Sequence, residues 1–532
     1  MTCTIGRRWP TGLLFLVFLF LFSPAGAQDA GYYQLADERQ LWRTGDNAAG
    51  LALDMRDSSD NRGVAFFDLR HRSGDYRRVQ EGGQQNQLRF FTERYQKIGK
   101  YLYGYGSFDF DMGRLKDRAW SDVLRTYDSN PFISGSSVRG KYDFQNFTLR
   151  AKLSSVQIGH FNYGAAIYYK VGDLSRLRDP RSRVRLADYQ VTPSVIYTFG
   201  KATVPDGSPS GLSATVHSLG LSAHYRRYKE KLVGLTTVQT DPNLQYYTMS
   251  GMEYASGSVG AYSSYSREYV NHEFGGELSY GYRQGAYHSR HAVTFSHGTE
   301  YAYGQYKYEP GLWVTNRYGF NTQNRLRQGR LLHSLDAAIG YEEGYADQYN
   351  QELVTEKDGA YTTQYWRNKM TYRKRYQLKK LDLGIHYRLS LTDGDRLKGY
   401  AGVRYDWQRV SNKHLLATSQ LKHSASLLGL EGGCGLVGQR LWVHAGLDRR
   451  ISHRADLDLS NPATDYAVAV LIPDMEYYRA SYWQGRLELL YQQPLTIKGR
   501  RTLWFAKLYG SYLKTANSLD GKTAGLTVGL YY

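Results

Sequence analysis

The sequence predicts an all-β fold: a transmembrane antiparallel up-and-down β-barrel of about 16 to 20 strands, with 16 or 18 preferred. Three observations support this fold class. The chain begins with an export signal, most of the remaining chain alternates apolar and polar residues, and the last alternating segment ends in an aromatic residue. A helical membrane protein is excluded because its spans need apolar stretches of roughly 17 to 25 residues, and none occurs after the N-terminal region.

Residues 1–27 have the organisation of a secretory signal peptide. Arg7 and Arg8 precede an unbroken apolar run at residues 13–22, and small residues at 25–27 provide a cleavage site. The run is too short to span a bilayer. Paired arginines also occur in twin-arginine signals, but the very apolar run, and a barrel that is exported unfolded, favour the general secretory route.

Charge and cysteine content restrict the mature chain further. Lys and Arg number 68 against 49 Asp and Glu, a formal net charge of +19 that becomes +17 once Arg7 and Arg8 are removed with the signal. A positive lumen would favour anions, whereas nucleic acid is not accessible from this compartment. Cys434 would be the only cysteine left, so no internal disulfide can form.

Residues 28–61 form a short segment that we expect in the periplasm or in the barrel lumen. The stretch 47–51, Asn-Ala-Ala-Gly-Leu, resembles the Asn-Pro-Ala-Gly-Leu stretch near the N-terminus of long-chain fatty-acid transporter barrels, with Ala48 in place of proline. In that family the segment lies inside the barrel as a small plug. It is too short for the separate plug domain of an energy-coupled receptor.

Residues 62–532 alternate in the manner of barrel strands. In residues 381–391 the odd positions are apolar and the even positions are mostly polar, the pair Asp393 and Gly394 then predicts a turn, and the pattern returns in 397–407. A soluble sandwich also alternates. We read residues 363–391 as one long strand whose first half rises above the membrane, with a bulge near Leu378.

Aromatic residues and connection lengths favour lipid on the apolar side. Aromatic pairs expected at strand ends, at the lipid headgroup boundary, are Tyr301 with Tyr303, Tyr361 with Tyr365 and Tyr477 with Tyr478. Short links are expected at residues 327–330, 391–395, 436–440 and 496–499, and long polar links at 116–137, 345–361 and 453–473. Short periplasmic turns opposite long extracellular loops are typical of outer-membrane barrels.

The final segment alternates through Leu526, Val528, Leu530 and Tyr532. It resembles the C-terminal signal by which the barrel-assembly machinery recognises outer-membrane proteins. We therefore expect the barrel to close on itself in the outer membrane. Its expected partners are outer-membrane lipid and lipopolysaccharide, together with the assembly machinery and periplasmic chaperones during biogenesis.

The whole mature chain also resembles an uncharacterised family of outer-membrane barrels from Bacteroidota. The resemblance is carried by residues 47–51, 74–81, 120–123 and 178–181. It implies an outer-membrane barrel and no agreed biochemical activity.

The densest basic cluster comprises Arg176, Arg178, Arg181, Arg183 and Arg185. Arg suits bidentate contact with phosphate or carboxylate, so the cluster is a candidate site for lipopolysaccharide phosphates or an anionic solute. Alternatively, it is a solvated loop or a stretch of lumen wall balanced by Asp173 and Asp188.

Metal, cofactor and catalytic chemistry find little support. His288 and His291 should point to opposite faces of a strand, with His297 nearby, and residues 57–63 lack the Glu of a calcium loop. Ser296 and His297 are also adjacent and so on opposite faces. We expect no catalytic, metal or cofactor site, although a triad assembled across strands stays open.

Three functions are compatible with this fold. The first is a passive channel or transporter for a solute or apolar molecule. The second is a non-enzymatic partner barrel for a surface-assembly or secretion system or for surface proteins. The third is a hydrolase at the outer rim. A continuous lumen would favour the first, a blocked lumen with ordered loops the second, and a Ser/His or acid cluster the third.

Overall fold

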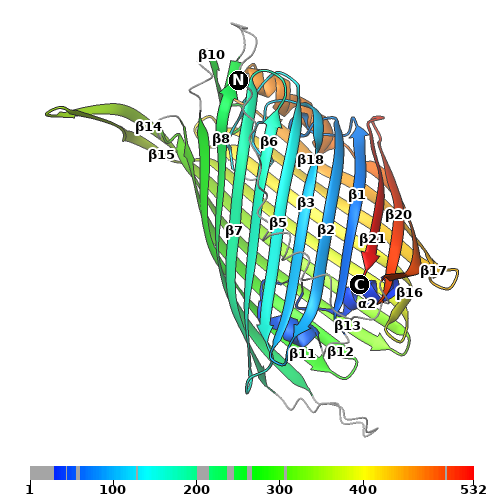
Figure 1. The fold of residues 1–532 in the computed structure, drawn as a ribbon. Helices are drawn as coiled ribbons and strands as arrows, with labels where there is room; N and C mark the ends of the chain where they lie inside the picture. Colours follow the sequence, from blue (N-terminus) through cyan, green and yellow to red (C-terminus); the bar gives the residue numbers. More distant parts are fainter. Residues whose placement is uncertain are drawn as a thin grey trace, which may run out of the picture.

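The computed structural model describes residues 29–43, 45–55, 60–127, 130–199, 215–236, 245–259, 266–304, 308–497 and 500–532. The predicted signal peptide and residues 57–59 of the candidate calcium loop at 57–63 lie outside these residues. Eighteen of the described strands form one antiparallel sheet that closes into a barrel (Figure 1). Among the described residues, no helix is long and apolar enough to cross a bilayer.

The barrel strands succeed one another around the wall in chain order, each paired with its sequence neighbours. They are β1 (Arg62–Gly74), β2 (Gln84–Ile98), β3 (Leu102–Arg118), β5 (Gly140–Ser155), β6 (Phe161–Arg176), β7 (Arg181–Phe199), β8 (Val216–Thr236), β11 (Arg267–Gln284), β12 (Tyr287–Tyr303), β13 (Gly311–Gln328), β14 (Leu331–Asp358), β15 (Tyr361–Asp393), β16 (Arg396–His414), β17 (Ser419–Leu436), β18 (Leu441–Asp458), β19 (Tyr482–Ile497), β20 (Arg500–Thr515) and β21 (Asp520–Tyr531).

The first and last strands close the barrel. β1 pairs with β21 from Val64 opposite Tyr531 to Gly74 opposite Gly521. Beyond β21, Gly63 and Tyr532 exchange backbone hydrogen bonds of 2.7 and 3.0 Å. The predicted all-β transmembrane barrel, with one of the two preferred strand counts, is therefore confirmed.

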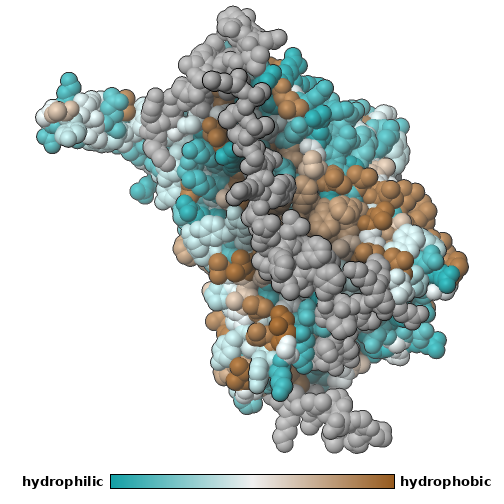
Figure 2. Space-filling model, in the orientation of Figure 1, coloured by the Kyte–Doolittle hydropathy of each residue, from teal (hydrophilic) through white to brown (hydrophobic). Residues whose placement is uncertain are grey.

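Alternation along each strand separates a lipid face from a lumen face, because successive side chains point to opposite sides. Apolar side chains that lie exposed on the outer face include Phe67, Leu69, Ile167, Leu221, Phe274, Val293, Ile385, Leu447, Leu487, Leu526 and Val528. Figure 2 shows hydrophobic residues around the middle of the visible face and hydrophilic residues towards its upper rim. This arrangement matches a bilayer surrounded by water on both sides.

The two ends of the barrel differ in their connections. At the end that carries Tyr532, called here the turn end, tight turns join β11 to β12, β13 to β14, β15 to β16 and β17 to β18. At the opposite loop end, long connections join β3 to β5, β8 to β11 and β18 to β19. Two short links predicted at 391–395 and 436–440 are among the turns of the turn end.

One predicted long loop is wrong. Residues 345–361 continue β14, which pairs with β15 up to Asp358 opposite Tyr361. The two strands are 28 and 33 residues long and rise together beyond the rim as a hairpin (Figure 1). Both faces of this hairpin are polar, so its sequence resembles that of a loop. The hairpin nevertheless consists of paired strands, with water on both sides.

Two finer predictions need correction for the same region. The irregular pairing of β15 falls opposite Ala346–Gln348 and Asn350–Gln351, several residues before the predicted bulge at Leu378. Lys374 there has a positive φ of 50°. Tyr361 and Tyr365 lie near the tip of the hairpin, above the rim, and so do not mark the headgroup boundary.

The N-terminal segment occupies the lumen near the turn end. Residues 29–43 and 45–55, called here the plug, comprise α2 (Ala30–Arg39), η1 (Ala48–Gly50) and α3 (Leu51–Asp54). Asp29 caps α2 by accepting a hydrogen bond from the Tyr32 amide. Leu35, Trp42 and Ala49 are buried against the wall.

Long connections fold over the loop end as a cap. The cap comprises η3 (Val79–Glu81), β4 (Phe132–Ser136), β9 (Gln245–Ser250), β10 (Ala255–Val259), the π-helical η6 (Ala467–Leu471) and α4 (Ile472–Arg479). β4, β9 and β10 form a separate small sheet. An apolar cluster joins the cap to Trp313 and Tyr376 on the wall and includes Trp120, Phe132, Tyr247, Tyr466 and Met475.

Replacing Ile385 by Arg should cost about 2–4 kcal/mol of folding stability, because the side chain is 41% exposed on the lipid face of β15. His386→Arg is the matched control, since His386 points into the lumen beside Glu431 and an Arg there remains next to a carboxylate. Urea unfolding of both variants in lipid vesicles measures the difference. Equal stabilities would show that this face does not contact lipid.

Replacing Tyr532 by Asp should sharply reduce the yield of folded protein in the membrane, if the last strand is the assembly signal. The Tyr532 hydroxyl lies 3.0 Å from Thr92 Oγ1, and its main chain completes the seam. Heat-modifiable mobility of the membrane fraction reports folding, and Tyr532→Phe provides the conservative control. Wild-type amounts of heat-modifiable Tyr532→Asp protein would contradict the assignment.

Candidate functional site

Among the cavities that the described residues leave inside the barrel, two are large and lie beside the plug and the cap. The cap chamber, of about 1050 Å³, lies between the cap and the inner wall of β13 to β18. The plug chamber, of about 690 Å³, lies between the plug and the inner wall of β13 to β20. Both have the size of small-molecule sites, so these chambers are the candidate functional site.

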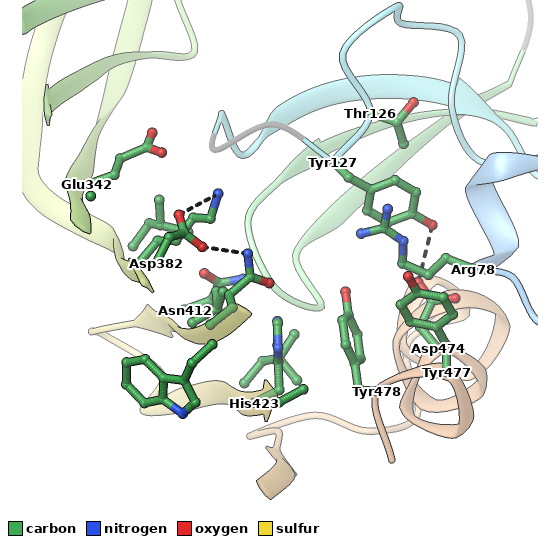
Figure 3. A pocket seen from close by; sticks show the side chains of 18 of the residues that line it. Arg78, Thr126, Tyr127, Glu342, Asp382, Asn412, His423, Asp474, Tyr477 and Tyr478 are labelled. Atoms are coloured by element: carbon green, nitrogen blue, oxygen red, sulfur yellow. Dashed lines mark hydrogen bonds and ion pairs between the residues drawn. The ribbon is translucent and has the colours of Figure 1, made fainter. Parts of the chain in front are cut away.

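One side of the cap chamber is aromatic and basic, as Figure 3 shows. The Arg78 guanidinium carbon lies 3.5 Å from the ring centre of Tyr127 and 5.3 Å from that of Tyr477. Tyr478 stacks on His423 with ring centres 4.3 Å apart. The rings come from α4 and the β3–β5 connection, so the cap supplies flat apolar faces beside a fixed positive charge.

The opposite side carries carboxylates and amides from the wall (Figure 3). Asp382 accepts a hydrogen bond of 2.7 Å from Gln408 and lies 3.1 Å from the Lys380 ammonium. Glu342 and Asn412 complete this side. A ligand between the two sides would meet aromatic faces on one side and hydrogen-bonding groups on the other.

Asp474 ties α4 to the rest of the cap. Its Oδ1 accepts a 2.7 Å hydrogen bond from the Val79 amide, and its Oδ2 accepts one of 3.3 Å from the Tyr127 hydroxyl. Burial raises the pKa of Asp474 to about 7, although these two bonds and the nearby Arg78 act in the opposite direction. Glu81, whose pKa is held low by Arg78, adds a further negative charge nearby.

The two chambers adjoin along one wall. On β15 the inward positions Asp382 and Gly384 line the cap chamber, and the next two, His386 and Arg388, line the plug chamber. Consecutive inward positions are about 6.6 Å apart along a strand. A glycine at the junction leaves this part of the wall without a side chain.

The plug chamber is lined by five carboxylates and four arginines, namely Asp37, Glu38, Asp336, Glu431, Glu488, Arg43, Arg325, Arg388 and Arg486. Glu431 Oε1 lies 3.3 Å from both His386 Nε2 and Arg388 Nη2. Between the chambers, Asp448 lies 3.1 Å from Arg404 and 2.9 Å from Arg486. The lumen on this side is therefore polar and nearly balanced in charge.

Besides its buried apolar side chains, the plug has many polar contacts with the wall. Arg325 Nε donates a 2.6 Å hydrogen bond to the Glu38 carbonyl, and Ser334 and Ser390 donate to the Glu38 carboxylate. Lys152 Nζ donates to the Arg43 and Gly45 carbonyls, at 2.9 Å each. Because these bonds reach strands on several sides of the barrel, the plug is fastened across the lumen.

The Asn47–Leu51 stretch lies inside the barrel. Asn47 accepts a hydrogen bond from the Ala49 amide, which caps η1, and its Nδ2 donates to the Val195 and Leu221 carbonyls. A Cβ at Gly50 would fall 2.4 Å from Trp42, so glycine is needed there for close packing. The glycine in this stretch therefore has a packing role within the plug.

The structure divides the predicted arginine cluster. Arg176 ends β6 on its inner face and is buried, donating to the Val138 carbonyl and the Tyr142 hydroxyl. Arg181, Arg183 and Arg185 project from the outer face of β7. Arg178 is exposed in the connection and donates to the Arg139 carbonyl.

The acidic residues expected to balance this cluster also divide. Asp173 lies 2.9 Å from Arg183 and 4.0 Å from Arg185, whereas Asp188 pairs with Arg226 inside the barrel.

On β12, His288 points inward and His291 outward. Likewise, Ser296 points inward and His297 outward. In the part of the chain that the structure describes, no three His, Cys, Asp or Glu residues form a group that could hold a metal.

Sequence reasoning missed the aromatic lining of the cap chamber. Tyr477 and Tyr478 were expected at a strand end facing lipid headgroups, but they lie on α4 and face the cavity (Figure 3). The signal that could have identified α4 is Pro473 followed by Asp474 at the start of a segment without alternation.

Comparison with models of protein families assigns the chain to a family. Residues 48–532 match the model described as "Family of unknown function (DUF6850)". The chain belongs to this family. No curated protein matches.

Several solved structures are similar to this family member at low identity. The copper transporter OprC matches with 10% identity and a TM-score of 0.38, over 90% of this chain and 81% of that one. The ferric citrate transporter FecA in its unliganded form matches with 8% identity and a TM-score of 0.42, over 90% of this chain and 79% of that one. OpdK of Pseudomonas aeruginosa with vanillate matches with 11% identity and a TM-score of 0.35, over 89% of this chain and 98% of that one.

The raised pKa of Asp474 predicts that the cap is more stable in acid. The neutral carboxyl is favoured in the folded cap, so its contribution is complete below about pH 4 and is lost as the pH rises towards 7. Hydrogen exchange of residues 466–480, corrected for intrinsic rates, should show protection that is weaker on the order of a hundredfold at pH 8 than at pH 5.

Asp474→Asn should remove this pH dependence, because an amide can keep both contacts without ionising. Glu476→Gln, an exposed position of the same helix, should leave it unchanged. Equal protection of the wild-type cap at both pH values would contradict the role of Asp474.

Proposed function

We propose that this protein is a non-enzymatic transport barrel of the outer membrane, exported through the general secretory route. It takes up a polar solute with at least one ring or apolar face in the cap chamber and passes it along the wall of β13 to β19. The observation that carries this function is the alignment of two polar chambers on one wall, at consecutive inward positions of β15.

The chemistry of the cap chamber supports this class of solute. Tyr127, Tyr477 and Tyr478 offer ring faces, while Arg78 and Asp382 offer charge and hydrogen bonds. Pockets that bind small molecules combine apolar walls with a few well-placed polar groups in this way. Asp448, paired with Arg404 and Arg486 between the chambers, would provide polar contacts during passage.

The direction of transport is given by the two ends. Short turns and the C-terminus face the periplasm in outer-membrane barrels, and long loops face outwards. The cap would therefore meet the solute first, and the plug would control release into the periplasm. With the cap and the plug in place, passage requires one of them to move.

A partner barrel for surface proteins is the second candidate. The hairpin of β14 and β15 rises above the rim and exposes Leu353, Tyr361 and Met370. Its free edges could pair with a strand of another protein. This function predicts a lumen that stays closed even when the plug is loosened.

Single-channel conductance in a planar bilayer separates the two functions. Lys152→Ala combined with Arg325→Ala removes charged hydrogen bonds from wall to plug, each worth about 1.5–3 kcal/mol. The open fraction should rise on the order of a hundredfold over the wild type. A folded but silent double variant would overturn transport and favour the partner barrel.

Blocking the chambers in this loosened variant tests the route. A Cβ at Gly340 meets no atom within 4 Å, so Gly340→Trp can extend into the cap chamber and should lower the unit conductance. Gly485→Trp is the matched control, because Gly485 is equally open but lies on the lipid face. Equal conductances of the two variants would show that the route lies elsewhere.

A further inference from the structure

Two neighbouring strands carry a patch of basic side chains on the outside of the barrel. Outward positions near the loop end of β7 and β8 hold the basic patch, composed of Arg181, Arg183, Arg185, Arg227, Lys229 and Lys231. Arg183 and Arg185 are 55% and 58% exposed, and Lys231 is 53% exposed. The patch lies on the outer wall and takes no part in the lining of either chamber.

Strand pairing brings these side chains together. Arg185 pairs with Lys231, and Ala187 with Lys229, across the β7–β8 ladder. Neighbouring strands are about 4.8 Å apart. The charges thus form one compact surface, and a single ligand head could contact several of them.

The patch is partly neutralised. Asp173 contacts both Arg183 and Arg185, and Glu268 lies 3.1 Å from Lys229 and 3.9 Å from Lys231. Asp179 lies 3.1 Å from Arg181. Three carboxylates thus face the six cations of the patch, so a positive excess remains. Such sharing holds the long side chains in place while leaving part of each donor group accessible.

The patch lies at the boundary between lipid and water. On the turn-end side of it, Tyr189 and Tyr225 contact each other with ring centres 6.4 Å apart. Further along come the apolar outward residues Val191, Val195, Tyr197, Phe199, Leu219 and Leu221. Aromatic rings mark the headgroup level of a barrel, so the patch stands at or just beyond the headgroups.

The same level of β12 and β13 lacks this concentration of charge. Outward positions of β12 and β13 carry His297, Thr299 and Asn316. Outward basic residues also occur near the loop end of β16 and β17, as Arg409, Lys413 and Lys422. The basic patch differs from them in holding six cations on two paired strands.

We propose that the basic patch binds the phosphate groups of an outer-leaflet glycolipid. Guanidinium groups contact phosphate through two parallel hydrogen bonds, and each basic side chain near a lipid surface adds to binding. The apolar face directly below would accept the acyl chains of the same molecule. A ligand with both parts fits this surface better than a free anion, which would use the charges alone.

This inference rests on the orientation given by the proposed function, with the loop end outside, and not on transport itself. The inference also changes the membership of the arginine site that the sequence predicts. Arg176 is excluded, because its guanidinium is buried. Arg227, Lys229 and Lys231, which are distant in sequence, enter it from β8.

The test uses bisphosphorylated lipid A, titrated into the purified full-length barrel in detergent and followed by native mass spectrometry. The variant is Arg183→Gln with Arg185→Gln and Lys231→Gln. Its affinity should fall on the order of a hundredfold, since each basic group near a lipid surface contributes about fivefold. The loss should shrink at high salt.

The control variant removes three outward charges from another part of the wall, through Arg409→Gln, Lys413→Gln and Lys422→Gln. It should bind like the wild type, and both variants should keep heat-modifiable mobility. Equal losses in the two variants, or no loss in either, would overturn the assignment.

Inorganic pyrophosphate distinguishes the two sources of phosphate. If the site binds a glycolipid, pyrophosphate should compete with lipid A only at a large excess. If pyrophosphate competes at equal concentration, the glycolipid assignment is overturned and the patch binds a free anion. Lipid A binding is measured in detergent and does not depend on conductance. Loss of the proposed lipid site and loss of the proposed transport function can therefore be told apart.

Discussion

Closure of the sheet is the constraint on which the rest of the structure depends. A lipid bilayer cannot hydrogen-bond an exposed strand edge, so β1 must find β21 across almost the whole chain. The seam continues past β21 through the mutual hydrogen bonds of Gly63 and Tyr532. Eighteen strands enclose a lumen wider than side chains can fill. The chain fills that space with its own segments, the plug at one end and the cap at the other, and the two chambers are what remains.

The excess positive charge of the chain is distributed unevenly by the same geometry. Inside, the cap chamber is lined by four carboxylates and four Lys or Arg, and the plug chamber by five carboxylates and four Arg, so the charged wall of the chambers is close to neutral. Outside, Asp173 and Glu268 are outnumbered on the surface of β7 and β8. A high net charge therefore does not by itself make the lumen selective for anions. The lumen offers alternating charges to a polar solute, and the excess faces the lipid headgroups.

Alternation predicted most of the wall because lipid imposes it. Ile385 and its outward neighbours must be apolar, and the turn at Gly394 agrees with its positive φ of 60°. The hairpin at 345–361 was missed because both of its faces meet water, which removes the alternation. Tyr477 and Tyr478 were misplaced because rings at a headgroup boundary and rings lining a cavity leave the same trace in sequence. The direction of Arg183 and Arg185 could have been obtained from their parity with Val191 and Val195, but the approach of Lys231 required the pairing of β7 with β8.

The two barriers in the lumen share buried apolar packing but differ in their polar contacts with the wall. Displacing the cap would expose rings such as Trp120, Phe132 and Tyr466, and each buried apolar side chain of this size contributes about 1.5–3 kcal/mol. The plug also buries apolar side chains, among them Leu35 and Trp42. In addition it accepts hydrogen bonds from Lys152, Arg325 and Ser390, which water can replace at a net cost of about 0.5–3 kcal/mol each. Water already has room beside it, in the plug chamber. Removing these hydrogen bonds therefore loosens the plug and leaves the cap in place as the roof of the chamber that selects the solute.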